Sequence, residues 1–236
     1  MFKISEKGHN IRNMFNDIAP RYDLLNRLLS LGIDRRWRRF AVGQLQIPPG
    51  GMVLDVATGT GDVALEIASR TPDSVRIIGE DFTQGMLLKG HEKIAASEYR
   101  DRIMLVNAPC EAIPHPSNLF DGVTIAFGIR NVVDRQAGLA EMCRVLKSGG
   151  RAVILEFSTP KNPIFKTIYT TYFHKILPFI GGLVSKRSAY KYLPDSVAEF
   201  PVQQQFKEMI SEAGFSDIRH HDLTFGIATV YVGVCP

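Results

Sequence analysis

The chain has 236 residues, of which 45% are hydrophobic and 22% are charged, and its formal net charge at pH 7 is +4. A chain of this size can bury one substantial core, so we expect a single domain over residues 1–236. The small, dispersed positive charge does not predict nucleic-acid binding, although it is compatible with an anionic membrane surface. Three cysteines without metal-ligand spacing argue against a disulfide scaffold or a metal site and favour a reducing compartment, the cytoplasm.

The N-terminal sequence MFKISEKGHN is polar and has no signal-peptide pattern. The chain also contains no run of 18 apolar residues, so we expect any membrane contact to be peripheral. Apolar positions between residues 9 and 31 follow a helical period that is broken at Pro20. This pattern predicts two helices within an N-terminal helical segment, residues 1–48, that precedes the main fold.

From residue 52 onward, short β-rich runs alternate with helical patterns. The predicted strands are 52–57, 75–81, 103–106, 120–127 and 151–157, and helices are predicted to begin near residues 61, 84 and 134. Such alternation is typical of βαβ units in a parallel sheet. Right-handed connections then place the carboxyl ends of these strands along one edge.

Residues 158–195 interrupt this alternation. They are rich in aromatic residues and prolines and contain no clear strand, so we expect an insertion that covers the sheet edge. A helix over about 201–213, stopped at Gly214, and two strands near 216–223 and 227–234 follow. Their short connection predicts an antiparallel pair. The predicted fold class is α/β, with a mostly parallel seven-stranded sheet and an antiparallel last strand.

The segment VLDVATGTGD, residues 53–62, is the most informative motif. Asp55 ends a strand, Gly59 and Gly61 let a ligand approach the backbone, and Asp62 opens the next helix. Asp81 lies 20 residues after Gly61, which is also the spacing of the ribose-binding acid in dinucleotide folds. Spacing alone therefore leaves NAD and S-adenosylmethionine as alternatives.

The charge around this loop distinguishes the two cofactors. A pyrophosphate requires bare amides and a positive field at the helix start, whereas Asp55 and Asp62 place negative charge on both sides of the loop. S-adenosylmethionine carries a sulfonium and an ammonium, which carboxylates attract. The sequence therefore favours S-adenosylmethionine as the cosubstrate. In the alternative interpretation, Asp62 only caps the helix and Asp55 is a strand-end acid satisfied within the protein.

Two further positions near this loop are polar. The second predicted strand ends in Glu80 and Asp81, and we expect Asp81 to accept hydrogen bonds from the ribose hydroxyls, with Glu80 as its solvated neighbour. Thr60, between the two glycines, is placed to meet the amino-acid end of the cofactor. An interpretation in which Thr60 only caps the following turn is equally consistent with the sequence.

The next two predicted strands end beside the expected cofactor. The third leads to Pro109 and Cys110, in the usual neighbourhood of an adenine ring. The fourth ends at Ala126-Phe127-Gly128, where small residues would bring the backbone close to the sulfur of the methyl donor.

Several ordered segments together resemble the ubiquinone/menaquinone biosynthesis C-methyltransferases over nearly the full length of the chain. They are YDLLN at 22–26 leading to SLGIDRRW at 30–37, the loop 53–62, FGIRNV at 127–132, RVLKSGG at 144–150 running into LEFS at 155–158, and AYKYLPDSV at 189–197. The resemblance implies a Rossmann-like, class I S-adenosylmethionine-dependent methyltransferase fold.

The resemblance also implies cofactor contacts at Thr60, Asp81, the Pro109–Cys110 pair and Ala126. The chain departs from the family pattern at two of these positions. Pro109 lacks both a side-chain acceptor and an N–H, so an adenine contact there must come from the Cys110 amide or from Asn107. Ala126 stands where a serine is usual, which removes a hydroxyl.

The reaction that the resemblance implies is transfer of a methyl group from S-adenosylmethionine to a ring carbon of a prenylated hydroquinone. Demethylmenaquinol, giving menaquinol, is the expected substrate, and a benzoquinol of ubiquinone biosynthesis is the alternative. Attack by carbon needs an electron-rich ring, so the neighbouring phenol should lose its proton before or during the displacement. A site that excludes water favours such a step.

Arg130 and Asn131 are the candidates for the substrate side. Arg130 stays protonated, so we expect it to stabilise the phenolate or to orient a water, while Asn131 bonds a ring oxygen. The alternative pairs Arg130 with a surface acid such as Asp134. Tyr22 and Asp23, in the N-terminal family segment, rank above His174 as general base, and the sequence assigns this role to none of them.

Residues 164–184 are apolar and aromatic, but charged residues and a proline interrupt them, so they do not predict a membrane span. We expect this face to grip the isoprenoid tail or to rest on the inner leaflet of the membrane. The alternative is a lid that packs on its own domain or on a second subunit of a homodimer.

Two other functions are consistent with part of the pattern. A rival enzyme would methylate a small soluble phenol or a sterol. A protein of another class would be a non-catalytic module that binds S-adenosylmethionine as a sensor.

Overall fold

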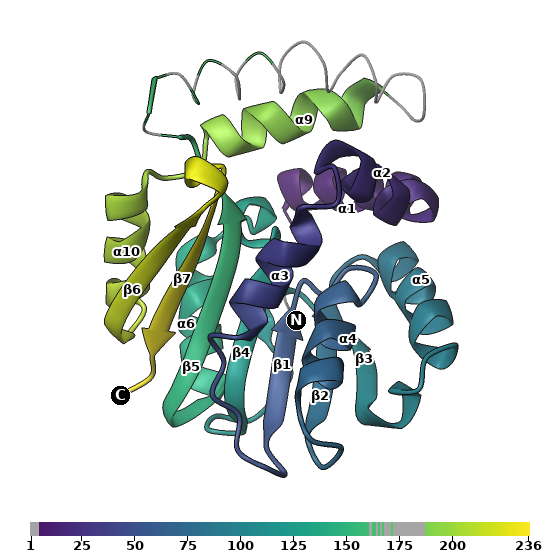
Figure 1. The fold of residues 1–236 in the computed structure, drawn as a ribbon, viewed down its shortest axis with the longest axis vertical. Coiled ribbons are helices and arrows are strands. Elements are labelled where there is room, and N and C mark those ends of the chain that lie inside the picture. The colour runs from purple at the N-terminus through teal and green to yellow at the C-terminus, as the bar shows by residue number, and fades with distance from the viewer. Residues whose placement is uncertain (1–4, 161, 164, 166, 168–170, 172–186) are drawn as a thin grey trace.

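The structure, a computed structural model, describes residues 5–160, 162–163, 165, 167, 171 and 187–236 (Figure 1). Its strands are β1 (Met52–Val56), β2 (Arg76–Asp81), β3 (Ile103–Asn107), β4 (Phe120–Ala126), β5 (Leu146–Phe157), β6 (Ser216–Leu223) and β7 (Ala228–Val234). They form one sheet in the order β3-β2-β1-β4-β5-β7-β6. Neighbours from β3 to β5 are parallel, whereas β7 is antiparallel to both β5 and β6. The predicted fold class is confirmed.

The connecting helices begin close to the predicted positions. They are α4 (Asp62–Arg70), α5 (Gln84–Ala95), α6 (Arg135–Val145) and α10 (Gln203–Glu212). Gly214, just after α10, has φ = 103°, the left-handed conformation that favours glycine at a helix end. The stop predicted from this glycine is therefore confirmed.

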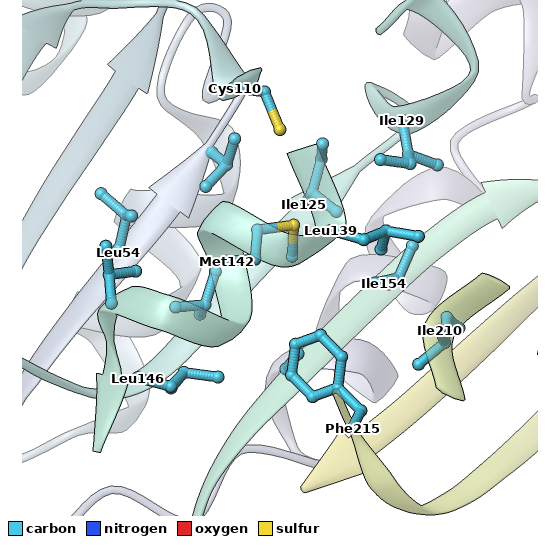
Figure 2. Packing of buried hydrophobic residues seen from close by; sticks show 14 of the residues in the cluster. Leu54, Cys110, Ile125, Ile129, Leu139, Met142, Leu146, Ile154, Ile210 and Phe215 are labelled. Atoms are coloured by element: carbon cyan, nitrogen blue, oxygen red, sulfur yellow. The ribbon is translucent and has the colours of Figure 1, made fainter. Parts of the chain in front are cut away.

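Successive residues of the central strands point to opposite faces of the sheet and enter different cores. Leu54 and Ile125 belong to a cluster with residues of α6 and α10, whereas Val53 belongs to a cluster with α4. Figure 2 shows Leu139 and Met142 of α6 among the sheet residues of the first cluster. The strands are thus buried on both faces, as a parallel sheet requires.

The N-terminal segment contains one more helix than the sequence predicted. The two expected helices are α1 (Glu6–Ile18) and α2 (Tyr22–Leu29), and α3 (Asp34–Val42) follows them. Four arginines dominate the sequence of α3 and conceal its narrow apolar stripe, in which Trp37 and Ala41 are 5% and 6% exposed. This stripe packs against β5 and β7 in a third buried cluster.

Much of the predicted insertion, 158–195, lies outside the described residues, including His174 and most of 164–184. The described part contains a helix, α9 (Arg187–Ala198), which runs past the predicted boundary and carries Pro194 within it. Figure 1 shows α9 above the N-terminal helices α1 and α2. No helix in the part of the chain that the structure describes is long and apolar enough to cross a membrane.

The strand order reverses beside β1, because the chain moves from β1 outward to β3 and then returns to β4 on the other side. In open α/β sheets, this reversal leaves a crevice outside the carboxyl ends of the two strands, where ligands bind. The loops after β1 and β4 therefore meet at the one place where a ligand site is expected.

The opposite edge of the sheet is held by a buried arginine. Arg102, just before β3, is 8% exposed, and its guanidinium donates to the carbonyl oxygens of Ala68 at 2.9 Å and Pro72 at 2.8 Å, as well as to the Thr71 hydroxyl at 2.9 Å. These bonds satisfy acceptors at and after the C-terminus of α4, which the helix itself leaves open.

We expect Arg102→Met to lower the free energy of unfolding by about 2–3 kcal/mol, because it leaves the buried carbonyl of Ala68 and the part-buried carbonyl of Pro72 without this donor. Arg100→Met is the matched control, since the Arg100 side chain is 67% exposed and lies 3.9 Å from Asp101. We expect the control to change stability by less than about 0.5 kcal/mol. Urea unfolding measures the free energy of unfolding of both variants. Equal losses in the two would contradict the role given to Arg102.

Candidate active site

A pocket of about 270 Å³ lies at the carboxyl ends of β1, β2 and β4. Residues of α1 and α2 close it from the N-terminal side, and the loops after β1, β3 and β4 form the remaining walls. Of the predicted cofactor residues, Gly59, Asp81, Pro109, Cys110 and Ala126 line this pocket. The topology thus brings together positions that are separated by almost 70 residues in the sequence.

The loop after β1 has an unusual backbone. Ala57, Gly59 and Gly61 have φ values of 51°, 58° and 81°, all in the left-handed region. For Ala57 this conformation is strained, so the surrounding structure must enforce it. Gly59 leaves its backbone open to the pocket, since a Cβ at this position would meet only Tyr22 Cε1, at 3.9 Å.

Asp55, near the end of β1, stabilises this loop through hydrogen bonds. Its side chain is 1% exposed, and its two oxygens accept hydrogen bonds from the hydroxyls of Thr58 at 2.5 Å and Thr124 at 2.7 Å. Burial raises the pKa of Asp55 to about 6. Asp55 is not among the pocket-lining residues, and its carboxylate joins β1, β4 and the loop.

Asp62 and Thr60 also face away from the pocket lining. Asp62 forms ion pairs with Arg38 at 3.0 Å and Lys93 at 2.7 Å. Although burial alone would raise it, these two cations hold the pKa of Asp62 below its ordinary value. The Thr60 hydroxyl donates to Asp23 at 2.5 Å and accepts from Lys93 at 3.0 Å. Asp62 was expected to contribute negative charge beside the cofactor loop, but Arg38 and Lys93 neutralise this charge.

Asp81 is the carboxylate that reaches the pocket from the end of β2. It is 6% exposed, and it accepts hydrogen bonds from the amides of Gly59 at 2.9 Å and Thr83 at 2.7 Å. Burial raises its pKa, and the two backbone bonds oppose that rise. Each oxygen keeps lone pairs for a further donor, so the carboxylate can accept hydrogen bonds from a ribose.

The wall after β3 is apolar. Pro109 precedes a short 3₁₀ turn, Cys110–Ala112, and the Cys110 thiol belongs to the buried cluster shown in Figure 2. Burial, the largest cause, raises the pKa of this thiol well above its ordinary value, so it stays protonated. The Asn107 side chain donates to the Asp81 carbonyl at 2.8 Å, so its amide nitrogen is already engaged.

The loop after β4 approaches the loop after β1 closely. Phe127 has φ = 57°, and a Cβ placed on Gly128 would lie 2.6 Å from the Cβ of Ala57. Only glycine therefore fits at position 128 without moving the cofactor loop. Ala126, whose small side chain faces the pocket, leaves room at the same wall.

Arg130 is buried and paired, but not with the acid that the sequence suggested. Its Nη1 lies 2.7 Å from Oε1 of Glu156, which is fully buried at the end of β5, and it also donates to the Phe127 carbonyl at 2.5 Å. Asp134 instead accepts from the amide of Ala137 and caps α6, so the predicted alternative pairing is wrong. Arg130 Nε is buried and has no hydrogen-bond partner among the described residues.

Asn131 lines the pocket and is hydrogen-bonded to a residue of α9. The hydroxyl of Tyr192, on α9, donates to Asn131 Oδ1 at 2.8 Å, and Asn131 Nδ2 donates to the Phe127 carbonyl at 3.4 Å. Burial raises the pKa of Tyr192, so this phenol keeps its proton and acts as the donor. The sequence analysis gave no role to Tyr192, because its partner is 61 residues away.

The two candidates for general base differ in their surroundings. Tyr22 lines the pocket, and burial, only partly opposed by a bond to Asn26 and the charge of Arg130, raises its pKa. Asp23 lies outside the lining, and its carboxylate is engaged by Lys93 at 2.5 Å and by Thr60. Tyr22 therefore offers a hydroxyl to the pocket, whereas Asp23 already has two partners.

Glu80 is a group that sequence reasoning misread. It was expected to be a solvated neighbour of Asp81, but its side chain is fully buried, and both of its oxygens are without a hydrogen-bond partner among the described residues. The nearest base is His115, whose Nε2 lies 3.9 Å away. Burial, followed by the charges of Asp81 and Glu141, raises the pKa of Glu80 to about 8. The spacing between Gly61 and Asp81 identified Asp81 as a functional acid, but it contains no information about whether the neighbouring Glu80 is buried.

This pocket at the reversal point of a 3-2-1-4-5-7-6 sheet defines a class I methyltransferase fold. The [4+2]-cyclase SpnF shares the fold, with a TM-score of 0.72 at 15% identity and coverage of 95% of each chain. A methyltransferase from Aquifex aeolicus described as SAM-dependent has a TM-score of 0.63 at 15% identity and covers 84% of this chain and 89% of its own. These similarities concern the fold alone.

The family model described as the ubiE/COQ5 methyltransferase family matches residues 3–235. A Geobacter sulfurreducens protein named ubiquinone/menaquinone biosynthesis C-methyltransferase UbiE is 64% identical over 233 residues, which are 99% of this chain and 91% of that protein. A Thermus thermophilus protein named demethylmenaquinone methyltransferase is 47% identical over 224 residues, which are 94% of this chain and 100% of that one. The chain belongs to the ubiE/COQ5 methyltransferase family, and S-adenosylmethionine is its methyl donor.

The pocket residues fit this cosubstrate. The bare backbone at Gly59, the Asp81 carboxylate and the apolar side chains of Phe82 and Met86 suit a nucleoside, and small residues at Ala57 and Ala126 leave space beside them. No cluster of three or more histidines, cysteines or acids in the described part of the chain could hold a metal ion.

Because Glu80 is buried, we expect the free energy of unfolding to depend on pH. The folded state keeps the proton up to about pH 8, whereas the unfolded chain releases it near pH 4.5, so the stabilising contribution is complete below pH 4.5 and is lost as the pH rises toward 8. Relative to the wild type, Glu80→Gln should gain stability between pH 5 and pH 8, by up to about 4 kcal/mol. Any effect of the glutamine amide that does not depend on pH shifts the stability difference by a constant and does not change its slope against pH.

The measurement is chemical unfolding of both proteins across this pH range. Glu212→Gln, at an exposed position at the end of α10, is the control and should show no such slope. A stability difference for Glu80→Gln that stays constant with pH would mean that Glu80 ionises normally in the fold.

Proposed function

We propose that this enzyme transfers a methyl group from S-adenosylmethionine to a ring carbon of a prenylated hydroquinone, with demethylmenaquinol as substrate and menaquinol as product. The relatives named after quinone biosynthesis and demethylmenaquinone methylation support the acceptor class. The observation that carries the proposal is that one pocket joins the Gly59–Asp81 side to the Asn131 side, with buried Arg130 next to Asn131. C-methylation of a polyprenyl benzoquinol is the second candidate, since the Geobacter relative is named for both pathways.

On the donor side, we propose that Asp81 binds the ribose hydroxyls and that the amide of Gly59 approaches the cofactor backbone. Pro109 and Cys110 form the adenine wall, and Ala126 lies near the reacting methyl group. Asp55, Thr60 and Gly61 act indirectly, because their described contacts hold the loop in place. Bound S-adenosylmethionine supplies an electrophilic methyl group.

On the acceptor side, Arg130 stabilises the phenolate or orients a water, and Asn131 bonds a ring oxygen. Glu156 fixes the guanidinium, and Arg130 Nε remains a donor without a partner among the described residues. A fixed, always charged donor in a buried site favours the anionic form of a phenol. Tyr22, whose raised pKa keeps it neutral, serves as a hydrogen-bond donor, and Asp23 serves to hold α2. The phenol proton then leaves to water that Arg130 orients. Once the ring carbon has gained the methyl group, that carbon loses its own proton to the ring oxygen, which restores the aromatic hydroquinone.

The test is turnover with labelled S-adenosylmethionine and two short-tailed quinols, a naphthoquinol and a benzoquinol, measured side by side. We expect label in the lipid phase and a kcat/KM at least about tenfold higher for the naphthoquinol, the ring type for which the Thermus relative is named. Preference for the benzoquinol would favour the second candidate. Label only in a water-soluble phenol, or binding without any transfer, would refute the proposal.

Arg130→Lys tests the acceptor side. The lysine keeps a cation for Glu156 but loses the planar fork, so we expect kcat to fall about 100-fold, while affinity for S-adenosylhomocysteine changes by less than about twofold. Arg144→Lys is the control, because Arg144 also pairs with a glutamate, Glu141 at 2.6 Å, but binds the carbonyls of Ile113 and His115 and does not adjoin Asn131. Full turnover by Arg130→Lys with intact cofactor binding would remove Arg130 from the reaction.

We also propose that the enzyme meets its prenylated substrate at the inner surface of the cytoplasmic membrane. The hydrophobicity of the tail supports this, as does the exposed Phe225, which is 68% exposed and stacks on Phe165 at 4.0 Å beside the 164–184 segment. Liposome flotation with anionic vesicles should recover the enzyme in the lipid fraction. A protein that stays in the aqueous phase with and without quinol, as a monomer or as a homodimer, would refute this part.

A further inference from the structure

The helices α1 and α2 form a cap over the pocket. Phe15 of α1 and Tyr22 of α2 line it together with Gly59 and Asp81 of the sheet edge. Figure 1 shows both helices lying between the carboxyl edge of the sheet and α9. Because Tyr22 Cε1 lies 3.9 Å from the position of a Cβ on Gly59, the cap is close to the backbone that a cofactor would approach. The cap therefore forms one wall of the part of the pocket in which we place the nucleoside.

Two sets of polar contacts between described residues join the cap to the body of the protein. Asn16 Oδ1, on α1, accepts from the amide of Gly85 at the start of α5, at 2.8 Å. Asp23, directly after Tyr22, makes the contacts of α2: it accepts from Thr60 of the cofactor loop at 2.5 Å and forms an ion pair with Lys93 of α5 at 2.5 Å. The second set fixes the residue next to Tyr22.

Lys93 is the centre of this second set. Its ammonium lies 2.5 Å from Asp23 Oδ2, 2.7 Å from Asp62 Oδ1 and 3.0 Å from the Thr60 hydroxyl, so its three donors have three partners. One partner belongs to the cap and two to the cofactor loop and the start of α4. Arg38 of α3 binds the second oxygen of Asp62 at 3.0 Å, which leaves Lys93 as the group that bridges the two carboxylates.

The charges at this point make the contact sensitive to loss of the lysine. Without the ammonium, Asp23 and Asp62 would face each other as two carboxylates with Thr60 between them, and like charges at such a distance repel. The side chains of Lys93 and Asp23 are 28% and 35% exposed, so salt in the solvent screens the pair only partly. The cap is thus held by an attraction that one substitution removes, which leaves Asp23 near Asp62 with only Arg38 to offset the second carboxylate.

We propose that Lys93 is a positioning residue that holds α2 over the cofactor pocket, so that its ion pair with Asp23 sets the rate at which S-adenosylmethionine and S-adenosylhomocysteine exchange. This inference rests on the proposed placement of the cofactor against Gly59 and Asp81. Lys93 touches neither the pocket nor the reacting atoms, and it acts through Asp23 on the neighbouring Tyr22.

The experiment measures dissociation of S-adenosylhomocysteine from the full-length enzyme by stopped-flow displacement. We expect Lys93→Met to raise the dissociation rate about 5- to 10-fold. The rate of Lys93→Arg should stay near that of the wild type, because arginine keeps the positive charge. Lys89→Met is the matched control on the same helix, since Lys89 pairs only with Glu92, at 2.7 Å, on the surface of α5. The control should leave the dissociation rate unchanged.

Asp23→Asn tests the other side of the pair. Combined with Lys93→Met, it removes the repulsion between the two carboxylates, so the double variant should release S-adenosylhomocysteine no faster than Lys93→Met alone. Raising the NaCl concentration from about 50 mM to about 500 mM should speed release from the wild type and leave Lys93→Met nearly unaffected. Amide hydrogen exchange over residues 6–29 should increase in Lys93→Met, which reports opening of the cap directly.

Unchanged release from Lys93→Met, or an equal effect of Lys89→Met, would overturn the inference. If Lys93→Met folds poorly, Lys93→Gln and the salt dependence of the wild type answer the same question. Failure of the wild type to bind S-adenosylhomocysteine would instead contradict the cofactor pocket. Release rates that follow the ion pair in an enzyme with no quinol turnover would contradict only the proposed substrate.

Discussion

The site depends on one buried carboxylate, that of Asp55. By accepting hydrogen bonds from Thr58 and Thr124, it joins the loop after β1 to β4, the neighbouring strand across the reversal of the sheet. Burial raises its pKa to about 6, so holding the charge near neutral pH destabilises the fold somewhat, and the two hydroxyls offset part of this penalty. With this loop fixed, Ala57 can keep its left-handed backbone and Gly128 can pack against it. The donor and acceptor sides of the pocket then occupy fixed positions relative to each other.

The sequence predicted the sheet well because its signals are local. Alternating apolar runs located every strand, and Gly214 marked a helix end through its own backbone preference. The third N-terminal helix was missed because the buried stripe around Trp37 is narrow and arginines surround it. A pattern of residue types reveals a helix only when enough of its surface is apolar.

The site was harder to predict, since it depends on which group each charge faces. The choice of S-adenosylmethionine rested on Asp55 and Asp62, but one is enclosed by hydroxyls and the other is neutralised by Arg38 and Lys93. Of Asp55, Asp62 and Asp81, it is Asp81, outside the 53–62 motif, that lines the pocket. Likewise, the alternative interpretation paired Arg130 with Asp134, four residues away, yet Arg130 pairs with Glu156 across the parallel strands. Pairings of this kind follow from the register of the sheet and not from spacing along the chain.

The position of Tyr22 links the two halves of the site. The charge of Asp81 raises its pKa and the charge of Arg130 lowers it, so this phenol lies within the electrostatic reach of both the donor side and the acceptor side. Asp23, the next residue, is held by Lys93. In the proposed mechanism, α2 therefore has two roles: it covers the cosubstrate, and it carries the neutral Tyr22 phenol that lines the pocket. Charge neutralisation in methyl transfer is favoured where bulk water is excluded, so the proposed reaction would benefit from a cap that covers the pocket.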